Sequence, residues 1–265
     1  MMVFQRFSTL LFVLLAHTAV FAQSGLSVSP PRNYFTVAAG QSESKKVLVS
    51  NPSKTTRLDL AVSLNDWNYD KMGNNVIQDA GTLPNSCANW ISIAPQTSFS
   101  IAPGETHELE IIVSPPAEVT DNLPVHTAMM YITQINPEDA VNEHGANIKV
   151  SVRTGIKIYQ RYPVARLAEI DIANFSYAKD QLLLEFNNIG NVWAEGSIEG
   201  ELIHQETGKK TPLSNLAFYS MPGDQRKTPI PLPEDLSKGK YIATVILNYG
   251  ESATIKMAEL NFTHD

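Results

Sequence analysis

The sequence predicts an all-β protein made of two immunoglobulin-like β-sandwiches in tandem. Short apolar runs alternate with polar residues at the two-residue period of strands, and no long stretch has a helical period. Turn residues separate these runs about every eight to twelve positions, a spacing typical of sandwiches. The 265 residues are enough for two such domains, which we expect at 23–163 and 164–265.

Residues 1–22 have the features of a secretory signal peptide. Arg6 supplies a positive charge, residues 10–16 form an apolar core, and Val20-Phe21-Ala22 fits the small-residue cleavage pattern. The apolar run is too short to cross a membrane. We therefore expect cleavage after Ala22, export to the periplasm, and a mature protein that is not an integral membrane protein.

The first domain begins with an interrupted strand. Residues 26–40 are broken by Pro30-Pro31 and resume at Arg32, which predicts an edge strand or a strand that changes sheets. Asn and Gly between residues 66 and 84 predict a loop with a short hairpin at 75–78, and a plain turn at 70–74 in place of a calcium loop. Further strands are predicted at 44–51, 58–67, 90–94, 99–104, 108–113 and 126–135.

The longest predicted strand covers residues 147–163 and follows a polar loop at 136–146. Ile148, Val150 and Val152 alternate with polar residues, so the two faces of this strand differ. Typical strands have about five or six residues, so this one is expected to extend beyond its sheet. Its apolar face either completes the core of this protein or is offered to another chain. In a regular strand Lys157 would face away from these three residues, and a bulge at Gly155 is the alternative that would re-aim it.

The second domain is predicted to contain about seven strands. The stretch at 236–243 has the pattern of a tyrosine corner, in which Tyr241 begins the penultimate strand and its hydroxyl group bonds back to the backbone.

The sequence offers little for catalysis or cofactor binding. The histidines lack metal-ligand spacing, and we find no nucleophile elbow and no phosphate-binding glycine loop. Glu108 and Glu110 fit a solvated strand face better than a carboxylate dyad. We therefore predict no catalytic residues, no metal, no cofactor and no enzymatic activity.

The charge and the cysteine content bear on the class of partner and on disulfide bonding. The net charge is −7 and no basic run is longer than a pair, which argues against a nucleic-acid partner. The single Cys87 has no partner for an internal disulfide. Because cysteine often packs as a small apolar residue, we expect it to be buried.

Three stretches together resemble one family. They are Val-Ser-Pro-Pro-Arg-Asn-Tyr-Phe at 28–35, Met-Met-Tyr-Ile-Thr-Gln-Ile-Asn-Pro at 129–137, and Ile-Lys-Ile-Tyr-Gln-Arg-Tyr-Pro at 156–163. In this order, behind a signal peptide, they resemble the PapD-like periplasmic chaperones of pilus assembly. The resemblance spans the whole mature chain.

The resemblance implies an ATP-independent chaperone that donates its last first-domain strand to an exported pilin-like subunit. Ile148, Val150 and Val152 would then be the donor residues. Arg32 and Lys157 would hold the C-terminal carboxylate of the subunit. Without such a role they would be an edge charge and a solvated strand lysine.

By the same resemblance, Arg161 would belong to the joint between the domains, and an outer-membrane usher would be a further partner. The alternative function is a secreted or cell-surface structural or adhesive module with the same sandwiches and no strand donation. An enzyme would need a convergent polar cluster, which the sequence does not contain.

Overall fold

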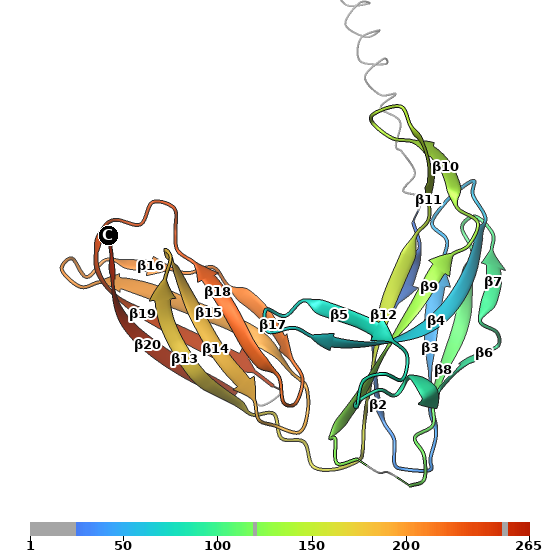
Figure 1. Ribbon diagram of the computed structural model, residues 1–265, viewed down its shortest axis with the longest axis horizontal. Coiled ribbons are helices and arrows are strands. Elements are labelled where there is room, and N and C mark those ends of the chain that lie inside the picture. Colours follow the sequence, from blue (N-terminus) through green and yellow to red (C-terminus); the bar gives the residue numbers. More distant parts are fainter. Residues whose placement is uncertain (1–24, 119–120, 251–253) are drawn as a thin grey trace, which may run out of the picture.

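The computed structural model describes residues 25–118, 121–250 and 254–265. The predicted signal peptide at 1–22 and its cleavage site lie outside these residues. The described chain forms two β-sandwiches that lie at an angle to each other (Figure 1). Within the described residues, the one helical segment is the single 3-10 turn η1 (Ala88–Trp90).

The first sandwich packs two sheets face to face, and its apolar strand positions point between them. One sheet has the order β1 (Ser27–Ser29), β3 (Glu43–Ser50), β8 (Thr106–Val113), β6 (Ile91–Ala94). The other has the order β2 (Arg32–Thr36), β12 (Arg153–Arg161), β9 (Val125–Gln134), β4 (Leu58–Tyr69), β5 (Asn75–Asp79), and β7 (Ser98–Ile101) also pairs with β4.

The first strand changes sheets at Pro30-Pro31, as predicted. Before the prolines, β1 pairs with β3 in one sheet, and after them β2 pairs with β12 in the other. Proline cannot donate to a ladder, so the break falls where pairing changes partner. The chain thereby places β2 beside β12.

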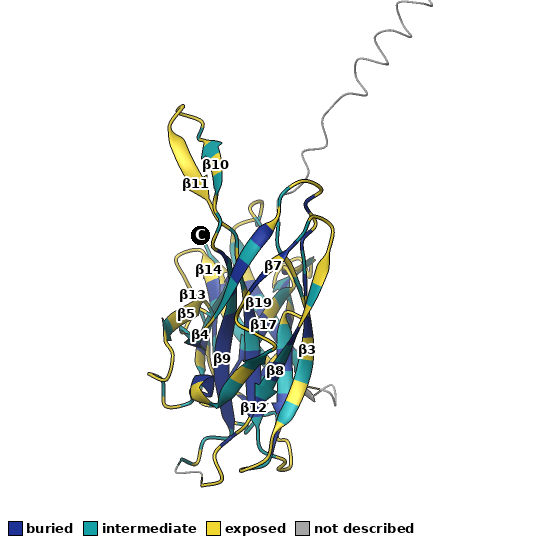
Figure 2. Ribbon diagram, turned by 90° about the vertical axis from the view of Figure 1, so that its right-hand side faces the viewer, coloured by how far each residue is buried: buried dark blue, intermediate teal, exposed yellow. Residues whose placement is uncertain are grey.

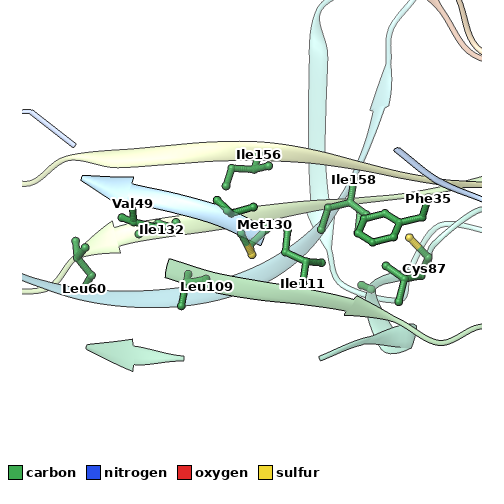
Figure 3. Packing of buried hydrophobic residues seen from close by; sticks show 14 of the residues in the cluster. Phe35, Val49, Leu60, Cys87, Leu109, Ile111, Met130, Ile132, Ile156 and Ile158 are labelled. Atoms are coloured by element: carbon green, nitrogen blue, oxygen red, sulfur yellow. The ribbon is translucent and has the colours of Figure 1, made fainter. Parts of the chain in front are cut away.

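The core between these sheets is apolar and closed. Phe35, Met130, Ile156 and Ile158 are fully buried and point into the same interior (Figure 3). Cys87 lies among them with no exposed surface, and this burial raises the pKa of its thiol. The prediction that Cys87 is a small buried residue is confirmed.

The second sandwich encloses a separate core. Its sheets have the orders β13 (Ile170–Ala178), β14 (Gln181–Asn188), β18 (Gln225–Pro231), and β16 (Lys210–Pro212), β15 (Ala194–His204), β19 (Gly239–Tyr249), β20 (Thr254–His264), with β17 (Leu216–Ser220) also pairing with β15. The tyrosine corner is confirmed, because the Tyr241 hydroxyl donates a 2.7 Å hydrogen bond to the Ser237 carbonyl oxygen. The fold prediction of two immunoglobulin-like sandwiches is therefore confirmed, whereas the boundary between residues 163 and 164 stays a prediction.

The prediction of one continuous strand over 147–163 is wrong. The segment is divided into β11 (Asn147–Val150) and β12, and β11 forms a hairpin with β10 (Glu138–Val141) inside the region expected to be a polar loop. Gln134 lies against the break: its carbonyl oxygen accepts a 2.5 Å hydrogen bond from the Ser151 hydroxyl, and its Oε1 accepts a 3.2 Å bond from the Val152 N–H.

Of the two alternatives for Lys157, the regular strand holds and the bulge at Gly155 does not. Gly155 pairs with Tyr131, and the register of β12 against β9 runs without a shift from Arg153 to Arg161. The irregularity lies instead at residues 151 and 152, between the two strands.

Other expected features can be placed briefly. The 70–74 segment is a turn, in which Asp70 Oδ1 accepts a 2.8 Å hydrogen bond from the Asn74 N–H. Among the residues that the structure describes, no three His, Cys, Asp or Glu side chains converge on a common metal position. In that same part of the chain, no helix has the length and apolar character needed to span a bilayer.

Candidate partner-binding site

The β10–β11 hairpin projects from the end of the first sandwich (Figure 2). All four residues of β11 are exposed, whereas half-buried and exposed residues alternate along β10. Ile148 lies opposite Ala140 and Val150 lies opposite Glu138, so these four side chains share one face of the hairpin. The Ile148 and Val150 side chains are exposed, at 39% and 44%. On the other face, Lys149 Nζ lies 2.7 Å from Asp139 Oδ1.

Val152 differs from the other two predicted donor residues. It lies between β11 and β12 and is half-buried, and its carbonyl oxygen accepts a 2.9 Å hydrogen bond from the Gln134 N–H. The structure thus presents Ile148 and Val150 together and places Val152 at the base of the hairpin.

One edge of this region carries no partner strand. β11 pairs with β10, and β12 continues the same ladder against β9. On the opposite side, β2 joins β12 only from Lys157 onward. Within the described residues, 147–156 therefore have no strand assigned on that side, and we call this stretch the open edge.

Arg32 and Lys157 meet where the open edge ends. The two are Cα partners in the parallel pair of β2 and β12, and the Lys157 N–H donates a 3.1 Å hydrogen bond to the Pro31 carbonyl oxygen. Because side chains of aligned partners leave a sheet on the same face, both cations lie on one side of it. That side faces away from the first core, since the neighbouring residues Ile156 and Ile158 are buried there.

The Lys157 ammonium group is held by polar and aromatic contacts. Its Nζ donates hydrogen bonds of 2.8 Å to the Tyr69 hydroxyl and 2.7 Å to Asn75 Oδ1, and lies 3.9 Å from the centre of the Trp67 ring. Burial, together with the positive charges of Arg32 and Arg226, lowers the pKa of Lys157 to about 8. The charges that shift this pKa are thus positive ones.

Arg32 faces the second domain. Its Cζ lies 4.4 Å from the centre of the Tyr219 ring, which belongs to β17. The contact is a cation–π interaction between the two sandwiches. Both predicted anchor residues thus lie between the two domains.

Aromatic rings from both sandwiches pack beside these cations. The Tyr34 ring stacks on Tyr159 at 4.9 Å between centroids and on Trp193 of the second domain at 4.8 Å. Trp67 meets Tyr159 edge-on at 5.5 Å. We call Tyr34, Trp67, Tyr159 and Trp193 the interdomain aromatic cluster. Pairs of this kind favour one relative placement of the rings and so of the domains.

Arg226 of β18 is a third cation at this place. Its residue surface is only 6% exposed, Nη1 donates a 2.7 Å hydrogen bond to the Tyr219 carbonyl oxygen, and Cζ lies 5.1 Å from the centre of the Tyr69 ring. Nothing in the sequence singles Arg226 out, because only tertiary packing brings its strand to the first domain. Most residues of the aromatic cluster carry no such signal either.

Among the described residues, none of these three cations has an ion pair with a carboxylate within 4.0 Å. Cations taken from water favour a nearby negative charge. Arg32, Lys157 and Arg226 thus form a group of three cations without a directly paired carboxylate among the described residues.

Arg161 lies at the end of β12, next to the connection between the domains. Its Nη1 donates a 3.1 Å hydrogen bond to the Val164 carbonyl oxygen. The β4–β5 hairpin makes another bridge, since the Lys71 carbonyl oxygen accepts a 2.7 Å bond from the Lys227 N–H (Figure 1). The part assigned to Arg161 in the joint stays a prediction.

Comparison with known proteins identifies solved structures with a similar fold. No family model matches the sequence, and no curated protein matches it. The YadV chaperone crystal structure is 14% identical, with 89% of this chain and 99% of that chain covered and a TM-score of 0.50. The CsuC–CsuE chaperone–tip adhesion subunit complex of Acinetobacter baumannii is 15% identical, with coverages of 89% and 97% and a TM-score of 0.49. The E. coli chaperone DraB is 16% identical, with coverages of 91% and 98% and a TM-score of 0.47.

The likeness to YadV extends over nearly the full length of both chains. The chain therefore has the fold of a PapD-like chaperone with two immunoglobulin-like sandwiches, which confirms the fold that the resemblance implied.

Proposed function

We propose that this chain is a periplasmic, ATP-independent chaperone that binds exported pilin-like subunits by adding its own strand to an incomplete subunit sheet. One observation carries the proposal: the open edge bears the exposed side chains of Ile148 and Val150 and ends at the paired cations Arg32 and Lys157. The fold, shared with the YadV chaperone, is consistent with this function.

The open edge provides main-chain pairing. In a ladder, alternate residues direct their N–H and C=O groups to opposite sides. Lys157 directs its N–H toward β2, so Gly155 and Arg153 direct theirs toward the open edge. An extended segment of another chain can accept and donate these bonds, as in other cases of strand addition.

The cations determine the direction of that segment. A C-terminal carboxylate bound at Arg32 and Lys157 requires the preceding residues of the partner to lie along 147–156. The bound segment then runs parallel to β11 and β12. From Lys157 back to Ile148 it spans about 30 Å, at roughly 3.3 Å per residue.

Exposed apolar side chains supply the remaining affinity. Ile148 and Val150 would enter the groove of an incomplete subunit, and each contributes about 1.5–3 kcal/mol when fully buried, before ordering costs. The subunit in turn hides an edge and a groove that favour aggregation. No nucleotide is needed, because pairing and burial themselves stabilise the complex. In this proposal an outer-membrane usher would receive the loaded subunit.

Co-expression with small exported β proteins encoded beside this gene tests the proposal. We expect a one-to-one complex, and we expect Arg32→Ala or Lys157→Ala to weaken it by about tenfold or more each, since hydrogen bonds to charged groups contribute about 1.5–3 kcal/mol. Lys46→Ala is the matched control, because Lys46 is an exposed lysine of β3 that pairs with Glu108. Full binding by both site variants would contradict the anchor, and no complex with any such subunit would favour the structural or adhesive alternative.

A further inference from the structure

We propose that Arg226 is a third cationic residue of the carboxylate anchor, contributed by the second domain. This inference rests on the proposed function and extends it, because it makes the anchor a property of both sandwiches. Its basis is the shared ring of Tyr69, whose centre lies 4.3 Å from Lys157 Nζ and 5.1 Å from Arg226 Cζ.

The guanidinium group of Arg226 is held in place, but not all of its hydrogen-bond donors have an acceptor. Arginine has five N–H donors. Nη1 donates to the Tyr219 carbonyl oxygen, whereas Nε is buried and has no hydrogen-bond partner among the described residues. A buried charged donor without a partner is costly, so a ligand that accepts its hydrogen bond is favoured.

The neighbouring carboxylate does not neutralise Arg226. Asp224 forms no ion pair with it within 4.0 Å; its Oδ2 instead accepts a 2.8 Å hydrogen bond from the Met221 N–H. Burial raises the pKa of Asp224. An incoming carboxylate would give Arg226 the direct ion pair that it does not make with Asp224.

The turn at 70–74 holds the guanidinium group in place. A Cβ atom on Gly73 would collide with Arg226 Nη2, so the backbone of the turn approaches the guanidinium group closely. This turn belongs to the β4–β5 hairpin, which also supplies Tyr69 and Asn75 to Lys157. One hairpin of the first domain thus contacts two of the three cations.

Two peptides test the inference in the full chain. They are a heptapeptide of alternating threonine and valine with a free C-terminus and the same peptide with a C-terminal amide. For the wild-type chain we expect the acid to bind about 10- to 100-fold more tightly than the amide, as charge-assisted bonds to a carboxylate predict.

For Arg226→Gln and Arg226→Met we expect this acid-over-amide preference to fall by about tenfold, with affinity for the amide unchanged. Arg226→Lys keeps the positive charge and should therefore retain most of the acid-over-amide preference. Lys227→Met is the matched control on the same strand, because Lys227 pairs with Glu185. Thermal unfolding identifies folded variants, and Arg226→Gln is included because an amide can still donate to the Tyr219 carbonyl oxygen.

The outcomes separate the two proposals. If the wild-type chain binds acid and amide equally, or binds neither, the anchor of the proposed function fails and Arg226 has no part to play. If the wild-type chain prefers the acid and folded Arg226→Gln keeps the whole preference, only the assignment of Arg226 is overturned.

Discussion

Arg32 lies directly beside Lys157 across the parallel pair of β2 and β12. Two cations side by side, with no carboxylate paired to either among the described residues, are unfavourable unless a negative charge joins them. Their position at the end of the open edge gives that charge a natural source in the terminus of an added strand.

The exposed apolar side chains of the hairpin should matter for binding and not for folding. We expect the double variant Ile148→Ser, Val150→Ser to lose subunit affinity by at least about tenfold, because each side chain contributes about 1.5–3 kcal/mol when buried. Its free energy of unfolding should change by less than about 1 kcal/mol, since both residues are already exposed. Titration calorimetry and urea denaturation measure the two quantities.

The control for this pair is Val141→Ser. Val141 is 64% exposed and lies on the other face of the same hairpin, opposite Asn147. If Val141→Ser weakens binding as much as the double variant does, the face of the hairpin that carries Ile148 and Val150 is not specifically the one that contacts the subunit.

Lys157 should make folding less favourable at neutral pH. Its pKa is about 8 in the folded chain, against the usual 10.5. Between pH 8 and 10.5 the unfolded chain therefore binds more protons, so the free energy of unfolding rises with pH across this window and the penalty is complete below pH 8. Compared with Lys157→Met, the wild-type chain should gain stability from pH 7.5 to pH 10 in urea denaturation.

The same titration should act oppositely on binding. Only the protonated lysine attracts a carboxylate, so affinity for the acid peptide should decline as pH rises above about 8, with affinity for the amide peptide unchanged. A flat profile for both peptides would show that the Lys157 charge is not used in binding.

The pairing of β10 with β11 should be compatible with subunit binding. The proposed partner strand adds to the open edge, and β10 occupies the opposite edge of β11. Val141 and Asn147 are Cα partners, a separation suited to a disulfide. We expect Val141→Cys, Asn147→Cys to bind the subunit equally well when oxidised and when reduced.

The native Cys87 should not interfere with this test, because it is completely buried. Each single-cysteine variant serves as a control for the substitutions themselves. Loss of binding on oxidation would mean that the subunit displaces β10 and uses both edges of β11.

The aromatic cluster should hold the angle between the domains. Trp193→Ala removes the contacts with Tyr34 and Tyr159, and aromatic pairs contribute about 0.5–1.5 kcal/mol each, so we expect a loss of about 1–3 kcal/mol of stability. Small-angle scattering should show a broader distribution of interdomain distances. An unchanged scattering profile would place the restraint elsewhere, in the contacts of the β4–β5 hairpin.

Local chemistry made much of the fold predictable. Pro30-Pro31 indicated the change of sheet, and the pattern around Tyr241 indicated the tyrosine corner, because both depend on neighbouring residues. The break at 151–152 was missed; there the side chain of Gln134 from another strand makes a contact that the local sequence does not show. β10 was missed because its four residues carry few apolar side chains.

The site was predictable in part. The family resemblance selected Arg32 and Lys157, which the fold brings side by side, and their role stays a proposal. Arg226 and Trp193 could not be selected from the sequence. Both belong to the second sandwich, and only the packing of the two domains brings them to the site.

If Arg32 and Lys157 hold the end of a bound segment, as proposed, they also fix the register of that segment. Residues of a bound segment are counted from its terminus, so this count decides which of them face Ile148 and Val150. Because side chains alternate, one added residue at the terminus would turn the polar set toward the apolar pair, and two would restore the match. The protein would thereby distinguish partner segments by the positions of their apolar residues relative to the terminus, as well as by their composition.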